Sequence, residues 1–235
     1  MPQNGFHSLI GAAVARRIWP GRRLWVLGFV LGSMIPDVDV LPLAIMRLSG
    51  YWGPGVHRTL THSVFLIGGI LAAAGVAWPR WRGTASFLTA FGLGMIGHVA
   101  LDLLLWFAGV DLVWPLSERR GWAEVNLWRW VRLPAVAGNP DAIGNELAAL
   151  EAVAYGLYLG YLRGRAREAG TRRRLVRFIG VVAAACWVLF PCYVVTGLVW
   201  SEWKQNVIVY GPSIVLFFPT SFVGTIGLRR ELAAR

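Results

Sequence analysis

The segment "ASFLTAFGLGMIGHVALDLLLWFAG", Ala85–Gly109, runs for 25 residues with a single charged side chain, Asp102. A helix needs about 20 apolar residues to cross the hydrocarbon core of a bilayer, with a range of about 17 to 25. This segment therefore predicts a membrane-spanning helix. Phe178–Trp200 and Val207–Leu228 are similarly long and apolar, and they predict two more.

Four weaker segments accompany these spans. Leu24–Met46 is long enough to cross a bilayer but holds "PDVD" in its middle. Val64–Trp78 and Ala148–Leu162 are short, so we expect them to be tilted, partly buried, or extended by polar residues that face a cavity. Phe6–Val14 is shorter still and predicts a half-membrane or interfacial helix. The pattern predicts an all-α, polytopic transmembrane bundle of about five or six segments, with short or half-membrane helices around a polar site.

The composition also favours a membrane protein. Hydrophobic residues make up 56% of the 235 residues and charged residues only 15%, whereas soluble domains carry roughly 25% charged residues. The net charge of +11 comes from arginines beside apolar runs, which is typical of cytoplasmic flanks and argues against a nucleic-acid partner. Cys186 and Cys192 lie in one apolar run and fit neither a disulfide framework nor a zinc knuckle.

The arginines also predict an orientation. If the cluster at 163–177 is cytoplasmic, alternation of the segments puts the clusters at 16–23, 80–82 and 229–235 on the same side. That side then holds 16 of the 23 basic residues, as the positive-inside tendency requires. We therefore expect a multi-pass protein of the bacterial inner membrane. We expect a membrane domain over residues 1–162, followed over 163–235 by a basic cytoplasmic linker and a C-terminal membrane hairpin.

Polar residues from four separate motifs meet at the opposite, outer face in this topology. The motifs contain all four histidines and three of the five aspartates of the chain. Charged groups at membrane depth are costly and usually mark function. The residues are His7, Asp37, Asp39, His57, His62, His98 and Asp102.

The spacing within these motifs suits metal coordination. His98 and Asp102 are four residues apart, so a helix projects them from one face, about one turn apart. Pro36 disfavours a continuous helix, and an unwound backbone there would let Asp37 and Asp39 face a polar cavity.

The other two histidines are arranged differently. His57 and His62 are five residues apart, which suits a loop that enters a helix better than one helical face. Thr61 or Ser63 would cap that helix.

Each motif also has a simpler interpretation. A lone histidine can be a hydrogen-bonded helix partner, "PDVD" can be a helix break with solvated carboxylates, and His98 with Asp102 can be a buried hydrogen bond between helices. Taken jointly, the four motifs favour a divalent-metal site. Mixed His and Asp ligands without thiolates favour zinc first, then manganese or iron. Several carboxylates suggest more than one ion, and two-metal sites typically hydrolyse phosphoesters.

Five motifs, in this order, resemble those of the YdjM-like family: "HSLIGAAVA", "GSMIPDVD", "HRTLTHS", "GHVALDLL" and "VWPLS". The resemblance covers Phe6 to Ser117. Members of that family are described as inner-membrane metal-dependent hydrolases, and some are labelled LexA-binding. The family is in turn distantly similar to zinc-dependent phospholipases C, whose sites hold a cluster of zinc ions.

The resemblance implies a set of metal ligands. "HVALD" is similar to the His-x-x-x-Asp ligand pair of those phospholipases. Their later histidine ligands have no counterpart here, because this chain has no histidine after His98, so we expect one or two ions. "GNELAALEAV" resembles a Gly-Asn…Glu segment of some YdjM-like members, so we expect Glu146 or Glu151 to be a metal ligand. The implied ligands are His7, Asp37 or Asp39, His57, His62, His98, Asp102 and one of these glutamates, with Glu151 preferred.

The sequence thus predicts metal-dependent hydrolysis of a phosphoester, with a membrane lipid as the expected substrate and partner. Metal-activated water would attack phosphorus, and Asp37 or Asp39 would bridge ions or act as general base. Arg58 would neutralise the phosphate as a bidentate donor, or else serve as a headgroup-facing anchor. A non-catalytic metal-binding scaffold or regulator and an ion transporter are the alternatives. The absence of a repeated helix pair argues against transport.

Overall fold

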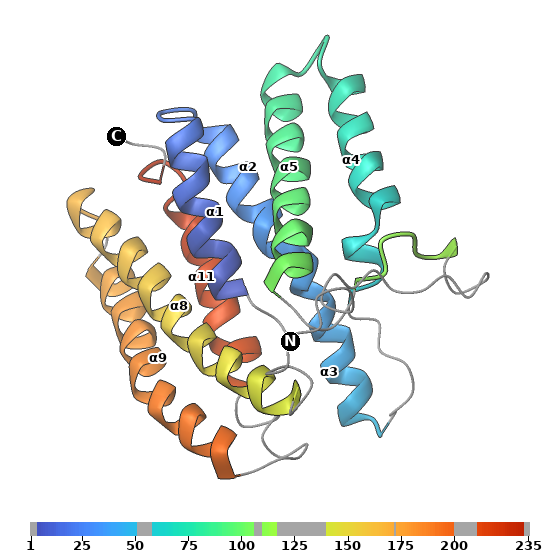
Figure 1. Ribbon diagram of the computed structural model, residues 1–235. Coiled ribbons are helices and arrows are strands. Elements are labelled where there is room, and N and C mark those ends of the chain that lie inside the picture. Colours follow the sequence, from blue (N-terminus) through green and yellow to red (C-terminus); the bar gives the residue numbers. More distant parts are fainter. Residues whose placement is uncertain are drawn as a thin grey trace. The chain divides into compact units, whose positions relative to one another are not determined.

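The computed structural model describes residues 4–50, 58–105, 110–116, 140–171, 173–199 and 211–232 (Figure 1). Every regular element in these ranges is a helix, which confirms the all-α prediction. The chain divides into two compact units, Gln3–Arg23 with Pro134–Arg235, and Leu24–Leu133. The domain boundary expected between residues 162 and 163 falls inside a helix of the first unit. That the two sides of this boundary have different functions stays a prediction.

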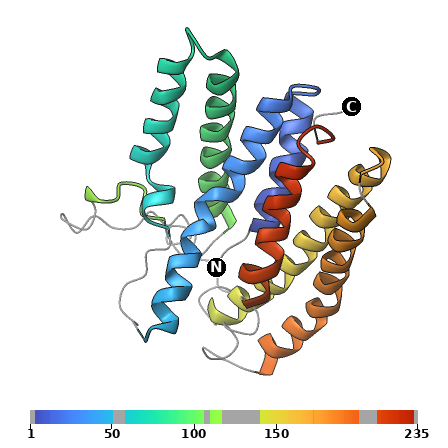
Figure 2. The ribbon, with the colours of Figure 1, turned by 180° about the vertical axis from the view of Figure 1, so that it is seen from behind.

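The first unit is built on a helical hairpin. Its elements are α1 (Asn4–Ile18), α8 (Pro140–Glu168), α9 (Arg173–Val199), the π-helical turn η4 (Ser213–Phe217) and α11 (Phe218–Gly227). α8 and α9 lie side by side, and α1 and α11 pack against α8 (Figures 1 and 2). The Tyr158 hydroxyl on α8 is 2.7 Å from Thr225 Oγ1 on α11, so a buried hydrogen bond joins these helices. Both α1 and α8 extend beyond the segments expected at Phe6–Val14 and Ala148–Leu162.

The second unit holds the polar motifs. Its elements are α2 (Arg23–Met34), the 3₁₀ turn η1 (Ile35–Asp39), α3 (Val40–Leu48), the 3₁₀ turn η2 (Leu60–His62), α4 (Val64–Ala77) and α5 (Arg82–Leu105). α4 and α5 lie side by side (Figure 1). Between them is an apolar core of Ile67, Met95, Val99 and Val110.

Glycines bring the backbones of α2 and α5 into direct contact. A Cβ atom at Gly28 would lie 2.5 Å from the Phe87 carbonyl oxygen. At Gly32 it would collide with the carbonyl of Phe91. Gly94, on α5, faces α2 in the same way. Small residues four apart are the usual device for close helix packing in membranes.

The helix break expected at Pro36 is confirmed. α2 ends at Met34, and Pro36 occupies the first turn of η1, where its missing N–H costs nothing. The chain tightens into a 3₁₀ turn here and continues into α3. This differs from the unwound backbone expected for "PDVD", because a 3₁₀ turn keeps local hydrogen bonds while redirecting the side chains.

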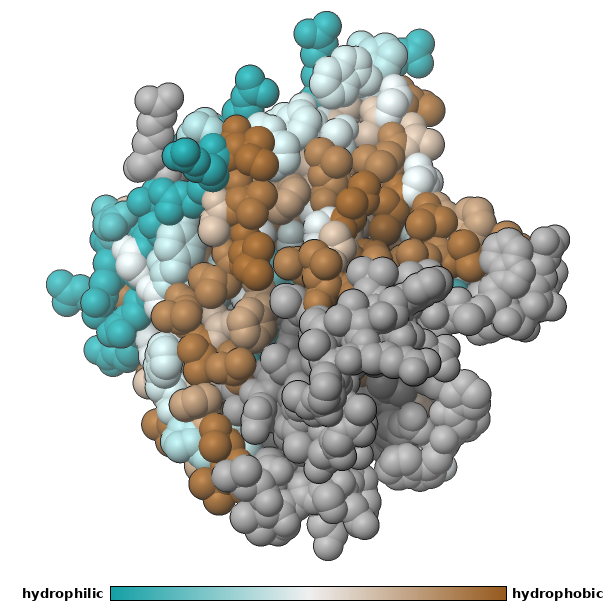
Figure 3. Space-filling model, viewed as in Figure 1, coloured by the Kyte–Doolittle hydropathy of each residue, from teal (hydrophilic) through white to brown (hydrophobic). Residues whose placement is uncertain are grey.

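Three helical segments are long and apolar enough to cross a membrane in the part of the chain that the structure describes: Arg23–Pro42, Arg82–Leu104 and Arg173–Val195. Apolar residues are exposed on the outer surface of the helices (Figure 3). Val76, for example, has 81% of its surface exposed. Such surfaces suit lipid contact. The segment expected at Val207–Leu228 is present, within the described residues, as a shorter apolar helix, and the total of five or six crossings stays a prediction.

Replacing Gly32 with alanine should destabilise the second unit, because the new methyl group would overlap the Phe91 carbonyl on α5. We expect a loss of about 1–3 kcal/mol in the free energy of unfolding, measured by thermal unfolding in detergent. Gly68→Ala is the matched control, since a Cβ at Gly68 meets no atom within 4 Å, and it should leave the unfolding temperature unchanged or slightly higher. Equal effects of the two changes would contradict the close contact.

Candidate metal site

Four acidic and histidine side chains of the second unit converge on one point. Asp37 comes from η1, His62 from η2, and His98 and Asp102 from α5. One ligand atom from each lies within 4.8 Å of the ligand atoms of the other three. All four side chains are buried, with at most 1% of their surface exposed. The motifs that the sequence singled out therefore meet in space.

The distances within this group match the edges of a metal coordination shell. His62 Nε2 lies 3.9 Å from Asp37 Oδ1 and 3.4 Å from Asp102 Oδ2. His98 Nε2 lies 3.5 Å from Asp37 Oδ1 and 3.6 Å from Asp102 Oδ2. Ligand atoms about 2.0–2.1 Å from a tetrahedral zinc ion lie about 3.3–3.4 Å from one another. The four nitrogen–oxygen distances between the histidines and the aspartates are therefore close to, or slightly longer than, those around a zinc ion.

The ring of His98 is oriented by the main chain of α2. His98 Nδ1 lies 2.8 Å from the Ser33 carbonyl oxygen. A carbonyl only accepts hydrogen bonds, so Nδ1 carries the proton and the lone pair of the neutral ring is on Nε2, inside the group. Pro36 helps to leave the carbonyl available, because a 3₁₀ hydrogen bond to Ser33 would have to come from residue 36, which has no N–H.

A hydroxyl and a carboxylate orient His62 in the same sense. Thr61 Oγ1 donates to Asp39 Oδ2 at 2.8 Å and lies 3.2 Å from His62 Nδ1. With its proton given to Asp39, this oxygen accepts from Nδ1, which again leaves Nε2 to face the group. Asp39 Oδ2 itself is 3.6 Å from His62 Nδ1. Metal-bound histidines commonly have such an outer partner.

The two aspartates of "PDVD" therefore lie on different sides of His62. Asp37 belongs to the four-residue group and Asp39 to the shell around it. Sequence analysis treated the two aspartates as equivalent. A 3₁₀ turn separates them, because at about three residues per turn the side chains of residues two apart point about 120° away from each other.

Arg58 is buried beside the group. Its Nε lies 3.6 Å from Asp102 Oδ2, and its backbone N–H donates to Asp39 Oδ2 at 2.8 Å. Its φ of 63° lies in the left-handed region, which is uncommon for a residue with a side chain and is found often at functional sites.

The charges of the buried side chains favour a divalent cation. Three carboxylates and one guanidinium leave two negative charges in excess when both imidazoles are neutral, as metal ligands are. A buried charge is tolerated only when it is paired or bound to a metal. A divalent ion would bring this cluster to neutrality.

The loop that carries His62 is held by residues 110–116. Ser63 caps α4 by accepting from the Phe65 N–H at 3.2 Å, which confirms one of the two expected caps. Its hydroxyl also donates to the Trp114 carbonyl at 2.8 Å, and the Asp111 N–H donates to the Arg58 carbonyl at 3.1 Å. The "VWPLS" motif thus supports the site without supplying a ligand to the group.

The remaining expected ligands fall elsewhere. His57 lies outside the described residues. His7, on α1, and Glu151, on α8, belong to the first unit, where the Glu151 carboxylate accepts from the N–H groups of Gly5 at 2.5 Å and Phe6 at 3.2 Å. A carboxylate at a helix N-terminus is electrostatically favourable. The ligand roles of His7 and Glu151, and the choice of Glu151 over Glu146, stay predictions.

Sequence reasoning missed two groups that matter to the site. Ser33 acts through its main-chain carbonyl, which leaves no signal in the residue type. Thr61 was considered only as a helix cap, although a hydroxyl directly before a histidine was a usable signal.

Comparison with known families agrees with the resemblance inferred from the motifs. Residues 3–203 match the family model described as "YdjM inner membrane protein". Comparisons with curated proteins and with solved structures give no match.

Replacing Thr61 with valine should weaken metal binding while preserving the side-chain shape. The variant removes the hydroxyl between Asp39 and His62, and loss of such an outer contact typically costs 10–100-fold in metal affinity. Competition titration with a zinc chelator measures the change. Thr61→Ser keeps the hydroxyl and should bind as the wild type does. Wild-type affinity in the valine variant would show that His62 needs no such support.

Proposed function

The chain belongs to the YdjM inner membrane protein family, and from that premise we propose that it is a membrane-bound, metal-dependent hydrolase of a phosphoester, with a membrane lipid as substrate. The observation that supports this most is the convergence of Asp37, His62, His98 and Asp102, with both imidazoles turned so that Nε2 faces the group. The catalytic proposal goes beyond two observations that do not depend on it. The chain has helices able to cross a membrane, and it has a buried cluster able to hold a metal ion.

The ligand set favours zinc. Two imidazole nitrogens and two carboxylate oxygens without a thiolate suit zinc best, with manganese or iron as the next candidates. The four-residue group accommodates one ion. A second ion, if bound, would need ligands beyond these four.

Each residue has a role that its contacts support. Asp37, His62, His98 and Asp102 bind the ion, while the Ser33 carbonyl and the Thr61 hydroxyl hold the Nδ1 protons. Asp39 positions His62 and the backbone of Arg58, so we assign it a positioning role in place of the general-base role expected for it. The Arg58 guanidinium would bind a phosphate oxygen and offset its charge.

The reaction would be a hydrolysis. A bound divalent ion supplies Lewis-acid polarisation at a phosphoryl oxygen. Water adds to phosphorus, one phosphorus–oxygen ester bond breaks, and the proton lost by water leaves with the released alcohol. The products are a phosphate monoester and an alcohol.

The position of the cluster along its helices suits a headgroup substrate. α2 and α5 both begin at arginines, and His98 lies 16 residues after Arg82, which is about 24 Å at about 1.5 Å per residue. A hydrocarbon core is about 30 Å thick. With the arginines on the cytoplasmic side, the cluster would lie near the outer headgroups.

A structural metal site is the second candidate. Four protein ligands, all buried, resemble closed structural zinc sites, whereas catalytic zinc usually has three protein ligands and one open position. In that case the ion would hold η1, η2 and α5 together without turnover.

His98→Ala and Asp102→Asn should both abolish stoichiometric metal binding, because each removes a ligand atom from the group. Elemental analysis of detergent-purified protein measures this, with Glu168→Gln, an exposed carboxylate on α8, as the control that should keep wild-type metal content. A wild type that stays metal-free after incubation with zinc and manganese would overturn both candidates.

Arg58→Gln separates the two candidates. If the protein is a hydrolase, this variant should keep its metal and lose about a hundredfold in the rate of phosphate-monoester release from phospholipid vesicles, since it removes charge stabilisation at phosphorus. If the metal is structural, the wild type releases no product, and chelation lowers the unfolding temperature instead. A fully active Arg58→Gln variant would contradict the role given to Arg58.

A further inference from the structure

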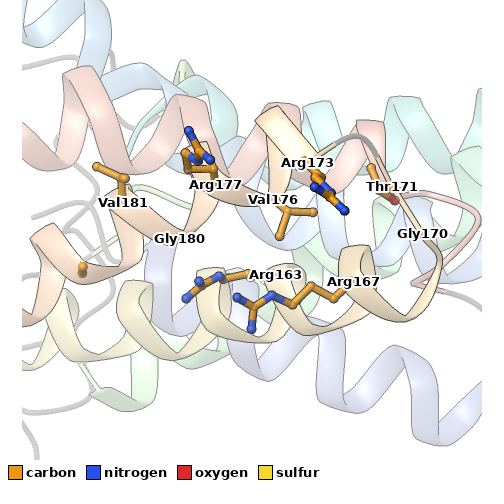
Figure 4. A pocket seen from close by; sticks show the side chains of 10 residues that line it. Arg163, Arg167, Gly170, Thr171, Arg173, Val176, Arg177, Gly180 and Val181 are labelled. Atoms are coloured by element: carbon orange, nitrogen blue, oxygen red, sulfur yellow. The ribbon is translucent and has the colours of Figure 1, made fainter.

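A groove of about 710 Å³ lies between α8 and α9, near the turn that joins them (Figure 4). Arg163 and Arg167 line it from α8, and Arg173 and Arg177 line it from α9. Neither the proposed metal site nor the hydrolysis uses this groove, which lies wholly in the first unit.

The four arginines have no acidic partner in the part of the chain that the structure describes. Arg163 Nε is buried there without a hydrogen-bond acceptor, which costs free energy unless a ligand supplies one. Gly180 makes room for this side chain, since a Cβ at that position would lie 2.7 Å from Arg163 Nε. Four arginines thus line one groove, and one of them has a buried N–H group without an acceptor, so the groove suits an anion.

Arg165, on the same helix, shows the contrast. Its Nη1 donates to Glu168 Oε2 at 2.8 Å, and its Nε and Nη2 donate to the Glu231 carbonyl at 3.1 and 2.7 Å. Arg165 does not line the groove. Arginines with intramolecular acceptors are therefore separated from those that face the groove.

The groove changes from charged to apolar along α9. Beyond the arginines its wall consists of Val176, Val181 and Ala184. Arg173 begins a segment able to cross a membrane, so the groove runs about 16 Å from the end of that segment into its apolar part. Hydrophilic residues gather at the turn end of the hairpin, with apolar surface further along it (Figure 3). Val181 has 63% of its surface exposed.

We propose that this groove binds an anionic phospholipid, with the headgroup phosphate among the four arginines and an acyl chain along Val181 and Ala184. Arginine suits this role because its planar fork binds phosphate oxygens in a bidentate manner. Basic pockets between membrane helices on the cytoplasmic side are typical sites for anionic lipids. A free phosphate or a nucleic acid would use the arginines but leave the apolar wall without a partner.

The test uses the full chain, delipidated in detergent and titrated with phosphatidylglycerol, phosphatidylcholine or inorganic phosphate, with bound ligand counted by native mass spectrometry. The double variant Arg167→Gln with Arg177→Gln removes two exposed guanidinium groups from the groove. Arg163→Gln removes the guanidinium of the half-buried arginine, whose Nε is buried. Arg229→Gln with Arg230→Gln removes equal charge from an exposed site outside the groove. Circular dichroism checks that each variant is folded.

We expect phosphatidylglycerol to bind the wild type and the Arg229/Arg230 variant equally, and at least about tenfold more tightly than phosphatidylcholine. Both groove variants should lose at least about tenfold in affinity for phosphatidylglycerol. Equal losses in the groove and control variants would overturn the proposal, because they would reflect net charge alone. Equal binding of the two lipids, or binding of inorganic phosphate as tightly as phosphatidylglycerol, would also overturn it.

Discussion

The close approach of α2 and α5 is the constraint on which the cluster depends. Gly28, Gly32 and Gly94 leave no side chain between the two backbones, so the Ser33 carbonyl comes within 2.8 Å of His98 Nδ1. Any larger residue at these positions would separate the helices and remove that hydrogen bond. The ring of His98 would then lose its defined tautomer, and Nε2 would no longer be directed at the two carboxylates.

The free energy of the cluster depends on what balances its charges. Asp37, Asp39, Asp102 and Arg58 are all buried in a unit whose outer surface is largely apolar. Desolvation of such groups is costly, and their mutual contacts offset only part of that cost. A divalent ion would offset the remainder, which couples metal binding to folding of the second unit. Function and stability at this site are therefore difficult to separate by mutation of the ligands, whereas Arg58 and Thr61 offer changes outside the ligand set.

Much of this arrangement follows from short-range rules. The all-α class, the break at Pro36, the pairing of His98 with Asp102 on one face and the cap at Ser63 were predicted from spacing and residue type alone. The different positions of Asp37 and Asp39 were not predicted, since they depend on a 3₁₀ turn in place of the expected unwound backbone. The contacts of Glu151 with the amides of Gly5 and Phe6 join residues 146 and 145 positions apart in the chain, which no local pattern encodes.

The two imidazoles are held by acceptors of different kinds, so their orientations differ in how easily a single substitution can disturb them. Thr61 supports His62 through a side chain, so a single codon change can remove that support. Ser33 supports His98 through a carbonyl that every amino acid possesses, so no substitution at position 33 deletes the acceptor itself. Only changes that move the helix backbones reach it. The support of His62 thus depends on a side chain, the Thr61 hydroxyl, whereas the support of His98 depends on the glycines that let α2 and α5 approach.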